Sequence, residues 1–170
     1  ELQKITKNRQ SQLDNRHKAG LPTVSLVGYT NAGKTSLFNR LTGKDRLIQD
    51  ALFVTLDTVT GKMFSQELQK EIIISDTIGF IHNLPPELID AFSSTLLESV
   101  HADILLHVID ATDPDIDRKM ETVEVILRKI KVQPKKRLFV FNKSDKLTAN
   151  QKKHIESAYK SFEPVFVSVK

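Results

Sequence analysis

The chain has 170 residues, a net charge of +4 and no cysteine, which excludes disulfide bonds and leaves enough sequence for one domain with a substantial core. No apolar run is long enough to span a membrane, and the first residues lack the apolar core of a signal peptide. We therefore expect a soluble, cytoplasmic protein whose contact with membranes is at most peripheral.

A short basic segment opens the chain, with five Lys or Arg and two Asp or Glu within residues 1–20. Its apolar residues recur at helical spacing until Gly20 and Pro22, and this thin apolar stripe favours a helix that connects to a neighbouring domain. The chain then divides into this connecting helix, residues 1–20, and a main domain, residues 21–170. The basic charge favours contact with a polyanion such as RNA; the alternative is an ordinary exposed helix face.

Residues 28–35 match the phosphate-loop pattern GxxxxGK[ST] without interruption. A strand-like apolar run at residues 23–27 precedes the loop and a helical pattern follows it to about Leu41, which is the context that this motif requires. The two glycines allow the loop to turn its N–H groups toward phosphate oxygens at the positive end of the helix. The candidate phosphate-binding residues are Gly28, Asn31, Ala32, Gly33, Lys34, Thr35 and Ser36.

Two of these residues carry distinct chemistry. Lys34 would place its ammonium group on the β and γ phosphates, which makes it a candidate catalytic residue, and the Thr35 hydroxyl would be a ligand of Mg²⁺. A second motif, DxxG, follows the buried run 72–75. Because ligands bind at the carboxyl ends of parallel strands, Asp76 can reach the same metal ion, and the Gly79 N–H can approach the γ-phosphate as a candidate catalytic contact. The alternative is an ordinary turn after a strand.

Residues 45–61 show no clean periodicity, and a loop of this length inside a compact domain predicts a mobile switch segment. The rest of the chain alternates between strand and helix patterns. We expect an antiparallel pair at 62–66 and 70–75, a helix at 85–100, a strand at 104–109, a helix from about 114–117 to 130, a strand at 137–141, a helix from Thr148 and a last strand at 165–167. This order predicts a three-layer α/β/α P-loop NTPase fold, with a mainly parallel, doubly wound sheet and one antiparallel edge strand.

The motif NKxD follows the strand expected at residues 137–141. The Asp145 carboxylate can accept hydrogen bonds from the N1 and 2-amino groups of guanine, a donor pair that adenine lacks, and the Asn142 amide can pair with both edges of a base. With Lys143, these residues form the candidate base-binding site and predict guanine over adenine. The alternative is a polar loop with an aspartate cap.

Together these motifs resemble those of translation-factor-related P-loop GTPases, and in finer detail the chain is similar to the HflX family of ribosome-associated GTPases. The resemblance spans about residues 21–170 and rests on residues 28–35, 52–57 and 76–81, and on Leu84-Pro85, Ala91-Phe92 and Thr95-Leu96. It implies that Thr55 closes on Mg²⁺ and the γ-phosphate, as a metal ligand and catalytic contact. It also implies that Ser168, Val169 and Lys170 form the last guanine-contact element, with a large domain before residue 1 and a last helix after residue 170.

The chain departs from the family pattern in places. Val169 stands where alanine is usual, and Thr58, Val59 and Gly61 differ from the family's switch sequence. Phe80 follows DxxG where many GTPases have a glutamine that positions water, and a phenyl ring cannot do so, which predicts slow intrinsic hydrolysis. Asn31 resembles the phosphate-loop asparagine of potassium-stimulated GTPases, so it indicates either a K⁺ site or a brace for the switch loop.

We therefore expect a monomeric GTP-hydrolysing switch that uses GTP, GDP and Mg²⁺. The large ribosomal subunit and its RNA are the partner that the resemblance implies, and no recognition of DNA sequence is expected. Two alternatives stay open: a P-loop ATPase or small-molecule kinase, and a nucleotide-binding RNA or ribosome scaffold with negligible turnover. The histidines match no metal-ligand spacing, and His107, in a buried strand, is expected to be a hydrogen-bonded core residue.

Overall fold

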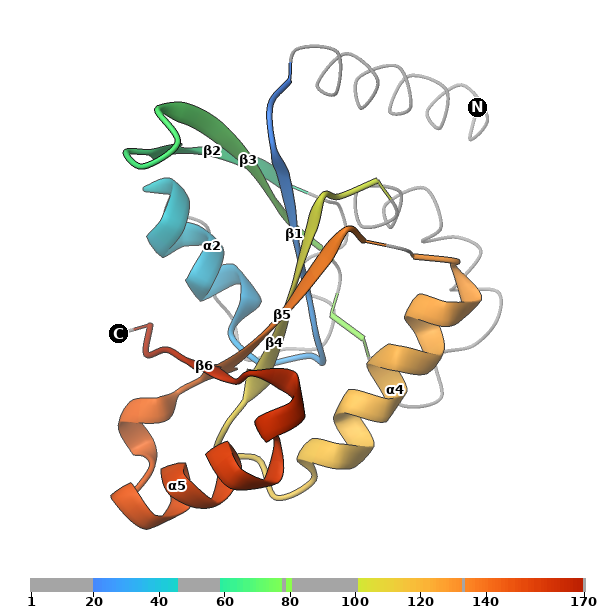
Figure 1. Cartoon of the computed structure of the whole chain (residues 1–170), viewed down its shortest axis with the longest axis vertical. Coiled ribbons are helices and arrows are strands. Elements are labelled where there is room, and N and C mark those ends of the chain that lie inside the picture. Colours follow the sequence, from blue (N-terminus) through green and yellow to red (C-terminus); the bar gives the residue numbers. More distant parts are fainter. Residues whose placement is uncertain (1–19, 46–58, 78, 81–100, 133, 170) are drawn as a thin grey trace.

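One six-stranded sheet forms the centre of the molecule, in the strand order β2-β3-β1-β4-β5-β6 (Figure 1). Neighbouring strands are parallel except for β2 and β3, which are antiparallel. The predicted sheet is therefore confirmed. The strands are β1 (Thr23–Val27), β2 (Val59–Ser65), β3 (Lys70–Asp76), β4 (Ile104–Asp110), β5 (Lys136–Asn142) and β6 (Val165–Phe166).

The structure is a computed structural model and describes residues 20–45, 59–77, 79–80, 101–132 and 134–169. Four expected features lie outside the described residues: the helix at 1–20 except for its last residue, the switch threonine Thr55, the helix at 85–100 and Lys170.

Helices cover both faces of the sheet, so the predicted three layers are confirmed (Figure 1). Because successive strand residues point to opposite faces, Leu26 and Val108 meet one helix layer, whereas Val27 and Leu105 meet the other. The helices are α2 (Lys34–Thr42) on the first face, α4 (Ile116–Lys129) and α5 (Ala149–Ala158) on the second, and the 3₁₀ turns η1 (Ser144–Lys146) and η2 (Lys160–Phe162).

Several strand boundaries differ from those expected by one residue, and the start of β2 differs by three. β2 begins at Val59 rather than at residue 62, because Val59 and Thr60 pair with the last two residues of β3. At the other edge, β6 ends at Phe166, although the Val167 N–H still donates to the Phe141 carbonyl at 3.0 Å.

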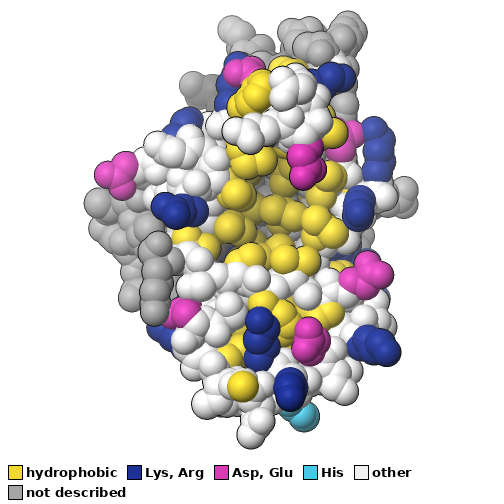
Figure 2. Space-filling model, turned by 60° about the vertical axis from the view of Figure 1, so that its left-hand side comes forward, with side chains coloured by type: hydrophobic (Ala, Val, Ile, Leu, Met, Phe, Trp, Pro, Cys, Tyr) yellow, Lys and Arg dark blue, Asp and Glu magenta, His cyan; other side chains and the backbone are white. Residues whose placement is uncertain are grey.

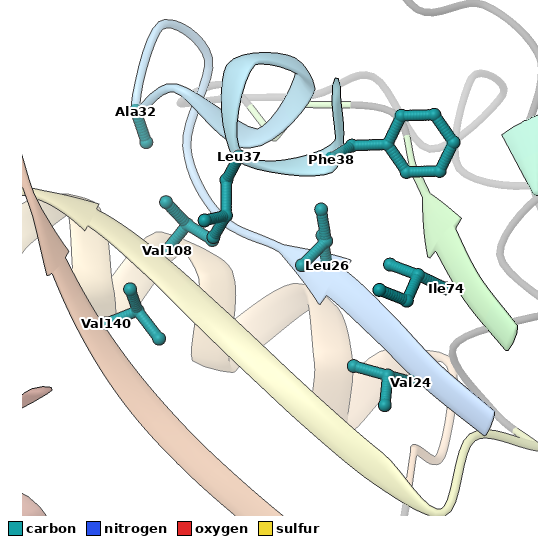
Figure 3. Close-up of a cluster of buried hydrophobic side chains, with 8 residues drawn as sticks. All are labelled: Val24, Leu26, Ala32, Leu37, Phe38, Ile74, Val108 and Val140. Carbon is teal, nitrogen blue, oxygen red and sulfur yellow. The ribbon is translucent and has the colours of Figure 1, made fainter. Parts of the chain in front are cut away.

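The buried cluster beneath α2 fixes the phosphate loop in space. Leu37 and Phe38 of α2 lie over Leu26, Ile74 and Val108 of three neighbouring strands (Figure 3). Burying each such side chain contributes about 1.5–3 kcal/mol. The start of α2, which follows the loop directly, is thereby held above the carboxyl ends of those strands.

The same face of the sheet is only partly covered. Ile104, Leu106 and Val167 pack against the cluster but remain half-exposed. Figure 2 shows apolar side chains gathered in the middle of this side of the molecule. Among the described residues, no helix has the length and hydropathy needed to cross a membrane.

Candidate functional site

The phosphate loop joins β1 to α2, and its two glycines occupy positions that other residues cannot. Gly28 has φ +152°, and a Cβ there would lie 2.2 Å from the Val108 carbonyl oxygen. Gly33 has φ +92°, and its Cβ would lie 2.2 Å from Asn142 Nδ2. Any side chain at either position would displace backbone or the Asn142 amide. The loop therefore packs directly on β4 and on the end of β5.

Lys34 lies inside the curve of this loop. Its ammonium group donates to the carbonyl oxygens of Gly28 at 3.2 Å and Tyr29 at 2.9 Å. The side chain is buried, and burial lowers the pKa of Lys34 to about 8, although the negative charge of Asp76 acts in the opposite direction. Among the described residues, this buried ammonium group is coordinated by carbonyl oxygens alone, which suits it to bind a phosphate chain.

Two oxygen ligands meet beside Lys34. Thr35 Oγ1, in the first turn of α2, donates to Asp76 Oδ2 at 2.9 Å, and Asp76 is fully buried at the end of β3. β1 pairs with β3 in parallel, with Leu26 opposite Asp76, so the two chain segments reach the same edge of the sheet. A hydroxyl and a carboxylate side by side are the donor types that Mg²⁺ takes in phosphate sites. The predicted ligands Thr35 and Asp76 are thus in contact.

The DxxG segment packs tightly against the phosphate loop. A Cβ on Gly79 would lie 2.9 Å from Thr30 Cγ2 and 3.1 Å from Lys34 Nζ, so the Gly79 backbone lies close to the ammonium group and a side chain there would require these neighbours to shift. The Phe80 N–H donates to the Gly28 carbonyl at 3.1 Å, and the Thr30 N–H donates to the Phe80 carbonyl at 2.9 Å. These bonds hold the Gly79 backbone against the phosphate loop, beside the Lys34 ammonium group.

The Phe80 side chain points away from the site. It is 1% exposed and packs in the core beneath α4, with Val27 and Leu105. The neighbouring Thr77 is also buried, and its hydroxyl donates to the Leu26 carbonyl at 2.6 Å. Both side chains tie this segment to the sheet. Thr77 was not singled out from the sequence, since a threonine inside DxxG carries no signal of its own.

The Asn142 amide makes a contact that was not predicted. Its Nδ2 donates to the Ala32 carbonyl at 3.0 Å, and the residue is 2% exposed at the end of β5. Its Oδ1 finds no hydrogen-bond partner among the described residues. Because this amide is buried against the phosphate loop, it braces the loop.

Lys143 makes a second bridge between the base motif and the phosphate loop. Its ammonium group donates to the Asn31 carbonyl at 2.9 Å and to Asp110 Oδ2 at 2.6 Å. Lys143 and Asn31 both have φ +61°, a backbone region that favours glycine or asparagine. Asn31 itself is exposed at the tip of the loop.

Asp110 is a site residue that the sequence reading missed. It ends β4 opposite Asn142 of β5, and its Oδ1 accepts hydrogen bonds from the Thr112 N–H at 2.9 Å and hydroxyl at 2.7 Å. Burial alone would raise the pKa of Asp110, but the bonds from Lys143 and Thr112 outweigh it and hold the pKa below its ordinary value. The only available signal was an aspartate at a strand end.

The predicted guanine-contact element at the end of the chain lies beside the NKxD motif. Ser168 Oγ donates to Asp145 Oδ1 at 2.7 Å, and the Ser144 N–H and hydroxyl both donate to the Val167 carbonyl, at 3.1 and 2.8 Å. Asp145 and Ser168 are both exposed, and Val169 packs against the cluster beneath α2. The structure therefore brings these two segments together. Ser36 is half-buried in the first turn of α2.

His107 differs from its prediction. It is 1% exposed, as expected, but Nδ1 has no hydrogen-bond partner in the described part of the chain, and the nearest carboxylate oxygen is Glu124 Oε1 at 3.7 Å. Burial lowers the pKa of His107 to about 3, helped by the positive charges of Arg137 and Lys34. The imidazole is therefore neutral and is a core residue.

Comparison with known proteins gives a consistent family. A family model described as 50S ribosome-binding GTPase matches residues 23–143. GTPase HflX of Caldanaerobacter subterraneus subsp. tengcongensis is 46% identical over 146 residues, which are 86% of this chain and 34% of that protein. GTPase HflX of Escherichia coli K12 is 43% identical over 146 residues, with the same two coverages. The chain thus spans about a third of the length of these relatives.

Solved structures are similar over most of the chain. A GTP-binding protein of Sulfolobus solfataricus in complex with GDP is 32% identical, with a TM-score of 0.63 over 96% of this chain and 52% of that one. Era of Aquifex aeolicus bound to GDP.AlF4- is 25% identical, with a TM-score of 0.67 over 88% of this chain and 51% of that one.

Proposed function

Because the chain belongs to the family of 50S ribosome-binding GTPases, and within it to the HflX GTPases, we propose that it binds GTP with Mg²⁺, hydrolyses it to GDP and phosphate, and acts as a molecular switch. The observation that carries this proposal is the convergence of Lys34, the Thr35–Asp76 pair and Asp145 at the carboxyl ends of β1, β3 and β5. In an open α/β sheet, that edge is where nucleotides bind.

Each residue has a role in this proposal. The loop N–H groups and Lys34 hold the β and γ phosphates, Thr35 and Asp76 hold Mg²⁺, and the Gly79 N–H contacts the γ-phosphate. Thr55 closes on the same metal and phosphate. These contacts exist only while the γ-phosphate is present, so hydrolysis releases the segments that carry Thr55 and Gly79. Magnesium, when bound, supplies charge neutralisation between the phosphates.

Asp145 sets the choice of base. Its carboxylate is exposed at the start of η1, and the Ser168 hydroxyl holds one oxygen in place, which leaves the carboxylate accessible to the N1 and 2-amino groups of guanine. We expect GDP, and not ADP, to displace a labelled guanine nucleotide. Asp145→Asn should shift binding toward xanthine nucleotides, whose 2-oxo group pairs with an amide donor. Competition binding measures both, and guanine selectivity retained by this variant would remove the assignment of Asp145.

Slow intrinsic turnover is part of the proposal. Phe80 is buried in the core and offers no group that could orient water, so the missing group would come from a partner, from the substrate phosphate or from a monovalent cation. Asn31, exposed at the tip of the phosphate loop, is the candidate for a K⁺ site. Phosphate release measured in sodium and in potassium tests this: equal rates would leave Asn31 as a brace only.

The proposed partner is the large ribosomal subunit and its RNA. The description of the matching family, 50S ribosome-binding GTPase, supports it. Multiple-turnover phosphate release with and without large subunits tests the partnership. If large subunits do not stimulate phosphate release and the RNA affinity is the same with and without nucleotide, the protein is a scaffold, which is the second candidate function.

We also propose that residues 21–170 form most of one G domain whose last helix lies outside this sequence, with residues 1–20 as a connecting helix. The half-exposed apolar residues Ile104, Leu106 and Val167 support it, because a parallel sheet is normally covered on both faces. We further propose that the protein is monomeric and cytoplasmic and that it does not recognise DNA sequence. Light scattering of the purified chain would measure the oligomeric state.

A further inference from the structure

A basic connection joins α4 to β5 at the end of the sheet opposite the phosphate loop (Figure 1). Residues 128–137 contain six Lys or Arg and no Asp or Glu, a charge of +6, whereas the whole chain carries +4, which leaves −2 for the rest. A single ten-residue connection thus accounts for more than the net positive charge of the chain.

Half of these cations are already engaged within the fold. Lys135 forms an ion pair with Asp103 at 2.6 Å, Arg137 pairs with Glu124, and Arg128 Nε donates to the Glu124 carbonyl at 3.3 Å. The first two contacts hold the start of β5 against β4 and α4, and the third lies within α4. They have a structural purpose and need no external partner.

The other three cations are Lys129, Lys131 and Lys136. All three are exposed, and within the described residues their side chains form no ion pair or hydrogen bond. A cation in the last turn of a helix is favoured by the helix dipole, which accounts for Lys129. The helix dipole does not account for Lys131 and Lys136, because both lie beyond the end of α4 at Lys129.

Lys131 occupies a backbone position that usually belongs to glycine. Its φ is +56°, its N–H donates to the Arg128 carbonyl at 3.1 Å, and the next N–H, of Val132, donates to the Leu127 carbonyl at 3.0 Å. This pattern is a Schellman motif, in which a left-handed residue follows the helix. Lysine there costs about 1 kcal/mol relative to glycine. The chain therefore carries an exposed lysine at a backbone position where it weakens the fold.

We propose that the basic connection forms a docking surface for the phosphate backbone of RNA through three of its lysines, Lys129, Lys131 and Lys136. Lysines act as point charges that contact phosphates without reading sequence. The stretch offers little for insertion into a lipid bilayer, because Val132 is buried and Ile130 half-buried. The surface rests on the proposed function only for the class of its partner, and it lies away from the nucleotide, so both could bind together.

The test compares two triple variants of the whole chain. The first is Lys129→Gln, Lys131→Gly and Lys136→Gln. The matched control removes the same charge from exposed lysines elsewhere: Lys70→Gln, Lys153→Gln and Lys160→Gln. Fluorescence anisotropy with a labelled RNA hairpin gives affinity over a range of salt concentrations, and GDP titration of each variant gives nucleotide affinity.

We expect the first variant to lose at least about tenfold in RNA affinity and to flatten the slope of log affinity against log salt by about 2–3, since each lost phosphate contact removes about 0.9. The control should keep most of its affinity, and both should bind GDP as the parent does. Equal losses in the two variants, or no RNA binding by the parent, would overturn the surface. The surface would also be overturned if the first variant kept its RNA affinity but lost binding to phosphatidylserine vesicles or to polyglutamate. Failure of GDP binding alone would instead refute the proposed function.

Lys131→Gly alone separates charge from folding. Glycine suits a φ of +56°, so this variant should unfold at the same urea concentration as the parent or a higher one while binding RNA more weakly. Weaker RNA binding accompanied by loss of stability would mean that the single variant acts through the fold.

Discussion

Lys34 is the residue whose charge a bound phosphate chain most directly alters. Without nucleotide its pKa is about 8, because the side chain is buried, and neighbouring phosphate charges would raise it. Binding above pH 8 therefore takes up a proton, so GDP affinity should be nearly constant below pH 7 and fall above pH 8, toward about tenfold per pH unit. Calorimetric titration from pH 6.5 to 9 measures this. Lys34→Arg, which does not titrate there, is the control, and a flat profile in the parent contradicts the assignment.

Asp110 controls the position of another residue, Lys143. With Asp110→Ala, the Lys143 ammonium loses its 2.6 Å partner and holds the Asn31 carbonyl less firmly. Hydrogen bonds to charged groups contribute about 1.5–3 kcal/mol, so GDP affinity should fall about tenfold or more. Asp110→Asn keeps an acceptor oxygen and should lose less. A double-mutant cycle with Lys143→Ala isolates the pair, and strictly additive losses would show that Asp110 does not act through Lys143.

At the scale of elements, hydrogen bonds to Asp103 join the amino ends of β1 and β4, at the end of these strands opposite the nucleotide site. Asp103, just before β4, accepts from the Thr23 N–H at 3.0 Å, the Thr23 hydroxyl at 2.9 Å and Lys135. Asp103→Ala should reduce the free energy of unfolding by about 1–3 kcal/mol, because the buried Thr23 N–H loses its acceptor. GDP affinity should not change, since the nucleotide site is at the other end of these strands. Urea denaturation and GDP titration of the same variant measure both, and a loss of GDP affinity larger than the loss of stability would contradict the separation.

The carboxylate of Asp103 also gives this fastening a pH dependence. Burial would raise its pKa, but the bonds from Lys135 and Thr23 outweigh burial and hold the pKa below its ordinary value. The stabilisation is therefore complete above the unfolded-state pKa, near 4, and is lost as the pH falls through the folded-state value. Acid unfolding of Asp103→Asn should show a shallower dependence in that range.

At the scale of the whole molecule, His107 makes the free energy of unfolding depend on pH in the acid range. Its folded-state pKa is about 3, against 6.5 as its ordinary value, so between these values the unfolded chain binds a proton that the folded protein does not. The free energy of unfolding should therefore rise with pH between about 3 and 6.5. His107→Leu, which keeps an apolar side chain in the core, should remove this part of the slope. Urea unfolding at several pH values measures it, and an unchanged slope would mean that His107 is protonated in the folded protein.

Local sequence patterns determined the order and kind of the described elements. Apolar runs predicted β1 and β4, the helical repeat predicted α4, and the capping box of Thr148 and Gln151 predicted the start of α5, where both hydrogen bonds form. Such signals involve residues a few positions apart, so they can be read without knowing the fold. The contact of Thr35 with Asp76 was also expected, because parallel strands bring their carboxyl ends to one edge.

Tertiary structure alone decided which polar groups pair across the site. Asn142 reaches Ala32, 110 residues earlier in the chain, and Lys143 reaches Asn31 and Asp110, so the base motif braces the phosphate loop. The start of β2 at Val59 depends on a partner strand, and the buried Nδ1 of His107 depends on how α4 packs. These features follow from contacts between distant segments, whose geometry is set only when the sheet closes against its helices. Sequence patterns record the chemistry of each residue but not the partner that folding brings to it.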